Sequence, residues 1–180
     1  MDMEKAAFFK CILSVLIFQS MTIFNFTPDS DISNWNIVDD VVMGGRSDGD
    51  FKITTEGPGE FKGKISLDNN GGFSSVRYYF ESLNTNNYSK FVIRLKGDGK
   101  SYQFRVKNKR NNRYSYIFKF DTTEDWQTLE IPFSEMYASF RGYQLDLPNF
   151  KGDQMEEIAF LIGNKKVESF QILIDYISLK

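Results

Sequence analysis

The chain has 180 residues, a formal net charge of -2 and an aromatic content of 16%, and it contains no histidine. The missing imidazole excludes histidine-dependent catalytic triads and the commonest zinc ligand, and a lone cysteine excludes an internal disulfide. A chain of this length usually buries one hydrophobic core, so we expect a single domain. The composition therefore favours a binding protein over an enzyme and gives no reason to expect a nucleic-acid partner.

Residues 6–18 form an apolar run near the start of the chain. The run is too short to cross a bilayer comfortably, so no stable membrane span is expected. Its length and position are typical of a signal peptide. We therefore expect residues 1–21 to be a signal peptide or a short apolar helical extension, unless translation begins at Met21, and residues 22–180 to be the folded domain. A signal peptide would place the protein in the periplasm or outside the cell, and without one it would be cytoplasmic.

Beyond residue 22, apolar and polar side chains alternate in one run after another, a pattern that predicts strands with one buried face. Clusters of Gly and Asn between the runs favour turns. About nine or ten strands at this spacing predict an all-β sandwich or jelly roll. The runs cover residues 61–67, 76–80, 91–95, 102–106, 114–120, 129–133, 158–162 and 170–179.

Positive charge is concentrated in residues 90–119, which hold ten Lys or Arg against one acid, so this segment carries +9 and the rest of the chain carries -11. Several polar side chains of this segment and of the run at 76–80 have the parity opposite to the apolar residues of their own strands, so they should lie on the same kind of outward surface. If these strands pair, the resulting cationic sheet face would suit an acidic partner, a phosphate or an anionic glycan, or it would simply be solvated. The outward set is Arg77, Tyr79, Arg94, Gln103, Arg105 and Lys107.

Two adjacent carboxylates, Asp39 and Asp40, precede a glycine turn. Neighbouring residues of a strand point to opposite faces, so the pair is poorly placed for acid and base catalysis on one substrate. We expect one of them to accept backbone N–H groups from the turn formed by Met43, Gly44 and Gly45.

The segment 69–72 predicts a hairpin turn or a bulge. The alternative is that the amides of Asn69 and Asn70 and the hydroxyl of Ser74 bind a neutral polar ligand at the mouth of the sandwich. Asp29, Asp31 and Asp175 could meet in a calcium site, but no spacing signature supports one, so no metal or cofactor is predicted.

Three stretches carry a more specific signal: WNIVDDVVMGGRS at 35–47, SLDNNGGFSSVR at 66–77, and RLKGDG at 94–99 followed by YQFR at 102–105. Together they resemble the complex I intermediate-associated protein family, and the resemblance runs from about Ile23 to Lys180. It implies a galactose-binding-like jelly roll and, from the eukaryotic members, a role in assembling respiratory complex I. Since the N-terminal segment lacks the Arg-rich character of a mitochondrial transit peptide, the chain looks like a stand-alone bacterial-type member.

The function expected from these observations is a non-enzymatic, chaperone-like protein-interaction module, with a carbohydrate-binding module as the alternative and an enzyme ranked last. The expected partner is a protein, such as an assembly intermediate of a membrane complex, or else a glycan. The Gly-rich loops and the Arg-bearing sheet face supply the candidate residues. The candidate binding residues are Asp39, Asp40, Met43, Gly44, Gly45, Ser47, Asn69, Asn70, Gly71, Gly72, Ser74, Ser75, Arg77, Arg94, Gly97, Asp98, Gly99, Gln103 and Arg105.

Overall fold

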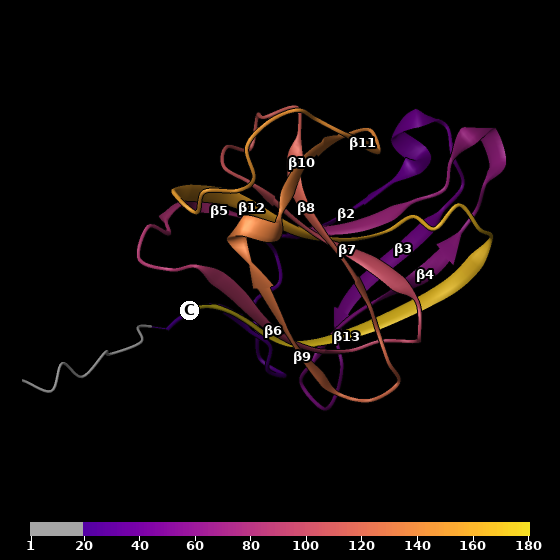
Figure 1. The fold of residues 1–180 in the computed structure, drawn as a ribbon. Coiled ribbons are helices and arrows are strands. Elements are labelled where there is room, and N and C mark those ends of the chain that lie inside the picture. Colours follow the sequence, from indigo (N-terminus) through magenta and orange to yellow (C-terminus); the bar gives the residue numbers. More distant parts are fainter. Residues whose placement is uncertain (1–19) are drawn as a thin grey trace, which may run out of the picture.

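The computed structural model describes residues 20–180, so the predicted helix and signal peptide fall almost wholly outside the described residues. Two layers of strands pack face to face (Figure 1). The helical segments of the described part are three short 3-10 turns: η1 (Asp40–Met43), η2 (Asp68–Asn70) and η3 (Phe133–Glu135). None of them has the length and apolarity needed to cross a bilayer.

Sheet A has the order β3-β4-β13-β6-β9, and β1 also pairs with β13. The long strand β13 pairs with β4 through its first half, and with β1 and β6 through its second half, so it occupies the middle of the sheet. The strands of sheet A are β1 (Met21–Asn25), β3 (Asp48–Ile53), β4 (Gly59–Ile65), β6 (Lys90–Lys96), β9 (Gln127–Pro132) and β13 (Glu168–Leu179).

Sheet B has the order β11-β10-β8-β7-β12-β5-β2, with every neighbouring pair antiparallel. Its strands are β2 (Trp35–Asp39), β5 (Ser74–Asn84), β7 (Ser101–Lys107), β8 (Ser115–Asp121), β10 (Tyr137–Phe140), β11 (Tyr143–Gln144) and β12 (Gln154–Ile162).

The predicted all-β sandwich is confirmed, although residues 20–180 hold thirteen strands where the sequence indicated about nine or ten. The additional strands are mostly short. β11, for example, has two residues, and a segment of that length cannot show a period of two.

The core lies between the sheets and is built by the alternation read from the sequence. Tyr102, Phe104 and Val106 of β7 are almost fully buried, whereas the residues between them face outward. Phe91 of sheet A meets Phe104 of sheet B with ring centroids 4.9 Å apart, and it lies 5.0 Å from Phe133. The aromatic side chains therefore fill the space between the layers.

Two turn segments carry the chain from one sheet to the other. The sequence predicts a hairpin turn or a bulge at 69–72, and the hairpin is wrong because the segment joins β4 of sheet A to β5 of sheet B. The segment 97–99 likewise joins β6 of sheet A to β7 of sheet B. Turn-forming residues permit a reversal, but which strand the chain then pairs with depends on the rest of the fold.

Replacement of Phe91 by Ala should lower the free energy of unfolding by about 3–5 kcal/mol, because it opens a cavity between the two sheets. Urea denaturation followed by tryptophan fluorescence would measure the change. Val167→Ala is the control, since Val167 is 63% exposed and should change stability by less than about 0.5 kcal/mol. Equal midpoints for the two variants would contradict the central position of Phe91.

Candidate functional site

The Asp40 carboxylate joins three segments of the chain. Its Oδ1 accepts the backbone N–H of Ser47 at 2.9 Å, and its Oδ2 accepts the Ser47 hydroxyl at 2.5 Å. The same Oδ2 accepts the backbone N–H groups of Gly72 at 2.5 Å and Phe73 at 3.3 Å. Asp40 thereby connects the end of β2 to the approach to β3 and to the start of β5.

The glycines around Asp40 are required by the close approach of the chain. A Cβ atom on Gly45 or Gly71 would collide with the Asp40 carboxylate. Burial alone would raise the pKa of Asp40, but hydrogen bonds from Ser47, Gly72 and Phe73 outweigh it and lower the pKa below its ordinary value of 3.8. This carboxylate is therefore an ionised structural anchor with its acceptor sites occupied.

The Asp39 carboxylate serves a separate contact. Its Oδ2 accepts the backbone N–H of Gly49 at 2.9 Å, so the two acids point to different segments. The prediction that one acid would accept N–H groups from the turn at Met43, Gly44 and Gly45 is wrong in its details. The N–H of Gly45 donates instead to the backbone carbonyl of Asp40, and that of Gly44 to the carbonyl of Val41.

The polar side chains of Asn69, Asn70 and Ser74 differ in their contacts: the first is hydrogen-bonded, the second is exposed, and the third is buried without a hydrogen-bond partner in the described part of the chain. The amide of Asn69 donates to the carbonyl of Gly44 at 2.9 Å, which holds η2 against η1 (Figure 1). The Ser74 hydroxyl is fully buried, whereas Asn70 is exposed. Of the three groups considered for a neutral ligand at the mouth of the sandwich, Asn70 alone is both exposed and without a hydrogen bond to a described residue that would occupy its amide.

Replacement of Asp40 by Asn should lower the free energy of unfolding by about 2–4 kcal/mol at neutral pH, because an amide cannot accept all four hydrogen bonds. The folded-state pKa of Asp40 lies below the unfolded one, so its contribution is present above about pH 4 and is lost as the pH falls through the folded-state value.

Urea melts of the wild type and Asp40→Asn at several pH values would show the difference between them shrinking in acid. Asp68→Asn is the control, because the side chain of Asp68 is 63% exposed and forms only a long ion pair with Arg46. An Asp40→Asn variant as stable as the wild type at neutral pH would contradict the anchoring role.

A second carboxylate, Asp98, ties the two sheets together where the chain crosses from β6 to β7. It accepts the Lys100 ammonium at 2.7 Å, the Tyr102 hydroxyl at 3.1 Å and the backbone N–H of Gln171 in β13 at 2.9 Å. Burial, reinforced by the charge of Asp98, raises the pKa of Tyr102 far above its usual range, so the phenol remains a neutral donor. Gly97 and Gly99 flank this anchor in the same turn.

Arg94 does not share a sheet face with Arg77 and Arg105, because its strand does not pair with theirs. It lies on β6 of sheet A, whereas Arg77 and Arg105 lie on sheet B. The Arg94 guanidinium pairs with Asp175 at 2.6 Å and covers the Trp126 ring at 4.7 Å from its centroid. The charge of Arg94 is therefore compensated by Asp175 of the same sheet.

The calcium site considered from the sequence gains no support from these positions. Asp175 is paired with Arg94, and Asp31 accepts the backbone N–H of Ser33 at 2.9 Å. Within residues 20–180, no group of three acidic or other metal-ligating side chains is placed to hold a metal ion.

The register of sheet B gathers cations on its outer face. Arg77 of β5 and Arg105 of β7 are both Cα partners of Ala159 in β12, one on each side. Lys107 is the partner of Glu157, two residues along β12. Because Ala159 ends at a methyl group, it leaves the space between the two Arg side chains open.

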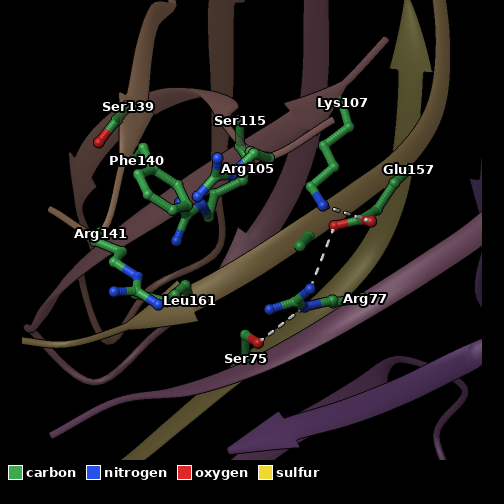
Figure 2. Close-up of a pocket in the computed structure, with 12 residues that line it drawn as sticks. Ser75, Arg77, Arg105, Lys107, Ser115, Ser139, Phe140, Arg141, Glu157 and Leu161 are labelled. Carbon is green, nitrogen blue, oxygen red and sulfur yellow. Dashed lines mark hydrogen bonds and ion pairs between the residues drawn. The ribbon is translucent and has the colours of Figure 1, made fainter. Parts of the chain in front are cut away.

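A cavity of about 200 Å³ lies over this part of the sheet. Figure 2 shows Arg77 and Lys107 turned toward Glu157, with Arg141 reaching in from the β10–β11 turn. Ser75, Ser115 and Ser139 contribute buried hydroxyl-bearing residues to the lining. We call this the cationic pocket, and its charged lining consists of Arg77, Arg105, Lys107, Arg113, Arg141 and Glu157.

Positive charge in the cationic pocket exceeds the negative charge by four. Glu157 lies 3.9 Å from Arg77 and 3.7 Å from Lys107, and Arg105 forms no ion pair with the residues that the structure describes. The Arg105 Nε atom is buried without a hydrogen-bond partner. Burial and the neighbouring charge of Arg77 lower the pKa of Arg105 to about 10, so the guanidinium is still charged at neutral pH.

Several pocket residues were absent from the sequence-based candidates. Arg113 and Arg141 flank the Phe140 ring, each with its guanidinium carbon 5.4 Å from the ring centroid. They come from loops at the ends of β7 and β10, and only the pairing of β8 with β10 brings them together. The outward direction of Glu157 could have been predicted from its parity, which is opposite to that of Ile158. The residues that lie beside Glu157 in the pocket could not have been predicted in this way.

Tyr79 and Gln103 also lie on the outer face of sheet B, as their parity predicted. The Tyr79 ring is covered by the Arg110 guanidinium at 4.6 Å, and the backbone N–H of Arg110 donates to Glu156 at 2.8 Å. One face of the Tyr79 ring is therefore occupied by the chain itself.

Comparison with known proteins gives a consistent family match. A family model described as Complex I intermediate-associated protein 30 (CIA30) matches residues 24–174. The mitochondrial protein of that name from Mus musculus is 23% identical over 188 residues, which cover 92% of this chain and 57% of the mouse protein. The Drosophila melanogaster protein is 24% identical over 194 residues, covering 92% of this chain and 66% of its own length. The chain thus spans less than two thirds of these relatives.

Solved structures with a similar fold include carbohydrate-binding modules. A family 11 module of a Clostridium thermocellum cellulase has a TM-score of 0.70 at 19% identity, covering 89% of this chain and 94% of the module. A family 11 module from the same organism, solved with a mixed-linked tetrasaccharide, has a TM-score of 0.67 at 20% identity, covering 86% and 94%. At these identities the likeness shows a shared jelly-roll fold.

Proposed function

Because the chain belongs to the Complex I intermediate-associated protein 30 family, we propose that it is a non-enzymatic module that binds a partner protein. The name of its relatives describes association with intermediates of complex I, and an assembly intermediate of a membrane complex is the kind of partner that we propose here. The partner would dock on the outer face of sheet B.

The observation that carries this proposal is the excess of positive charge in the cationic pocket. Five cationic side chains surround one carboxylate, and the exposed Arg113 and Arg141 stand at the loops around it. An acidic segment of a partner would compensate these charges, and complementary charge also steers association. The rest of the chain has a net negative charge, so the positive excess belongs to this pocket and not to the chain as a whole.

The carboxylates that could have served catalysis support a non-enzymatic role. Asp39 accepts the backbone N–H of Gly49, and Asp40 accepts backbone N–H groups and the Ser47 hydroxyl, so both carboxylates help to hold loops and strands together. The sequence also provides no histidine to act as a general base at neutral pH.

Reversal of two charges, Arg113→Glu with Arg141→Glu, should reduce recovery of the partner by at least about tenfold, because like charges then face each other across the interface. Both residues are exposed, so the fold should persist. Affinity purification of the tagged protein from its native cells, with quantitative mass spectrometry, would measure the loss.

The matched control is Lys64→Glu with Lys166→Glu, which makes the same change in net charge at exposed positions outside the pocket. The control should recover the partner as the wild type does. Equal recovery by the pocket variant, or a wild-type protein that repeatedly returns alone, would contradict the proposed docking face.

Glycan binding is the alternative function, suggested by the fold. A sugar ring usually stacks on an open aromatic face, and the Tyr79 ring on this side of the molecule is covered by Arg110. We therefore expect neutral β-glucans at millimolar concentration to leave the melting temperature of the wild type unchanged. The Arg110→Ala variant, which uncovers Tyr79, serves as a comparison. A saturable rise in the wild-type melting temperature would favour the glycan function instead.

A further inference from the structure

We propose that the cationic pocket binds one tetrahedral oxyanion, a phosphate or sulfate group, between the guanidinium groups of Arg77 and Arg105. The inference rests on the proposed function, in that it gives the chemistry of a group recognised at the same face. The group could be a free ion or an ester, and both sources present the same three or four oxygen atoms to the pocket.

The backbone register fixes the two guanidinium-bearing positions. Arg77 and Arg105 belong to the strands on either side of β12, opposite the same residue, Ala159. Neighbouring strands lie about 4.8 Å apart, so the two Cα atoms are separated by roughly two strand spacings, or about 10 Å. A methyl group on the floor between two long side chains leaves room for a small ligand that both can reach.

The excess of positive charge in the cationic pocket favours an anion over a neutral ligand. Glu157 is the one acid in the lining of the pocket, and its distances of 3.9 Å to Arg77 and 3.7 Å to Lys107 exceed the roughly 2.7–2.9 Å of a charge-assisted hydrogen bond. Glu157 therefore compensates these cations only in part. A dianion would remove half of the remaining excess of four charges.

The missing hydrogen-bond partners of Arg105 also favour an anionic ligand. Its Nε atom is buried and has no hydrogen-bond partner within the described residues, although guanidinium N–H groups are costly to bury unpaired. Arg77 is partly satisfied, because its Nε donates to the Ser75 hydroxyl at 3.3 Å. No other guanidinium nitrogen of Arg105 has a hydrogen bond or ion pair within the described residues either, so an oxyanion in the cavity would give the terminal nitrogen atoms of Arg105 an acceptor.

The size of the cavity favours a small group. Pockets for drug-sized ligands measure about 300–1,000 Å³, whereas this one measures about 200 Å³. Planar guanidinium groups match tetrahedral oxyanions through paired N–H donors. The buried Ser115 and Ser139 add hydroxyl groups to the wall, which can donate without adding charge.

The test is a titration of the isotope-labelled full chain with inorganic phosphate and with sulfate at constant ionic strength, followed by amide chemical shifts. We expect saturable shifts confined to β5, β7, β12 and the loops that carry Arg113 and Arg141. Acetate, a planar monoanion, should bind at least about tenfold more weakly. Absence of saturable phosphate and sulfate binding, or equal binding of acetate, would overturn the proposal.

Three variants sharpen the result. Arg105→Met keeps the apolar stem and should weaken phosphate binding by at least about tenfold, whereas Arg94→Met on sheet A should leave it unchanged. Glu157→Gln removes the competing carboxylate and should strengthen binding by about fivefold. If Arg105→Met is too unstable to titrate, a weaker affinity in folded Glu157→Gln is enough to refute the arrangement.

Comparison of inorganic phosphate with O-phosphoserine separates the two sources of the oxyanion. An ester that binds at least about tenfold more tightly indicates a group presented by a partner, and a free ion that binds as well or better indicates a solute. These titrations contain no partner protein. The two ideas can therefore fail separately. If the pocket binds neither phosphate nor sulfate, but the reversal of Arg113 and Arg141 abolishes partner recovery, this inference is wrong and the proposed function is still supported.

Discussion

The fold depends on a buried carboxylate at the edge of the sandwich. Asp40 holds together the end of β2, the segment before β3 and the segment before β5, which are the places where the chain changes sheets. Asp98 does the same between β6, β7 and β13. Carboxylates suit this task because each can accept several backbone N–H groups, and the glycines beside Asp40 allow the chain to approach it closely.

The stretches that resemble the family and the lining of the cationic pocket consist of largely different residues. The stretches that resemble the family, at 35–47, 66–77, 94–99 and 102–105, lie mainly around Asp40 and Asp98, which hold together the crossings between sheets. The cationic pocket takes only part of its lining from those motifs and draws Arg113, Arg141 and Glu157 from elsewhere. A common fold therefore leaves the chemistry of the outer face of sheet B free to differ between members.

The sequence predicted the strands well because alternation is a local property. Tyr102, Phe104 and Val106 face inward as their spacing indicated. Local pattern could not assign strands to sheets, and so it could not show that Arg94 and Arg105, which share an outward parity, lie on different sheets. The pocket required still more information, since its residues come from strands and loops far apart in the sequence and meet only through the pairing of β5, β7 and β12.

The central position of β13 has a consequence for the synthesis of the protein. This strand separates β4 from β6 and also pairs with β1, yet it is formed by residues 168–179. As the nascent chain leaves the ribosome, β1, β4 and β6 emerge before the strand that pairs with all three, and their edges remain open to other chains until it appears. Protection from aggregation is thus needed most during translation, because the order of synthesis delays the closure of sheet A.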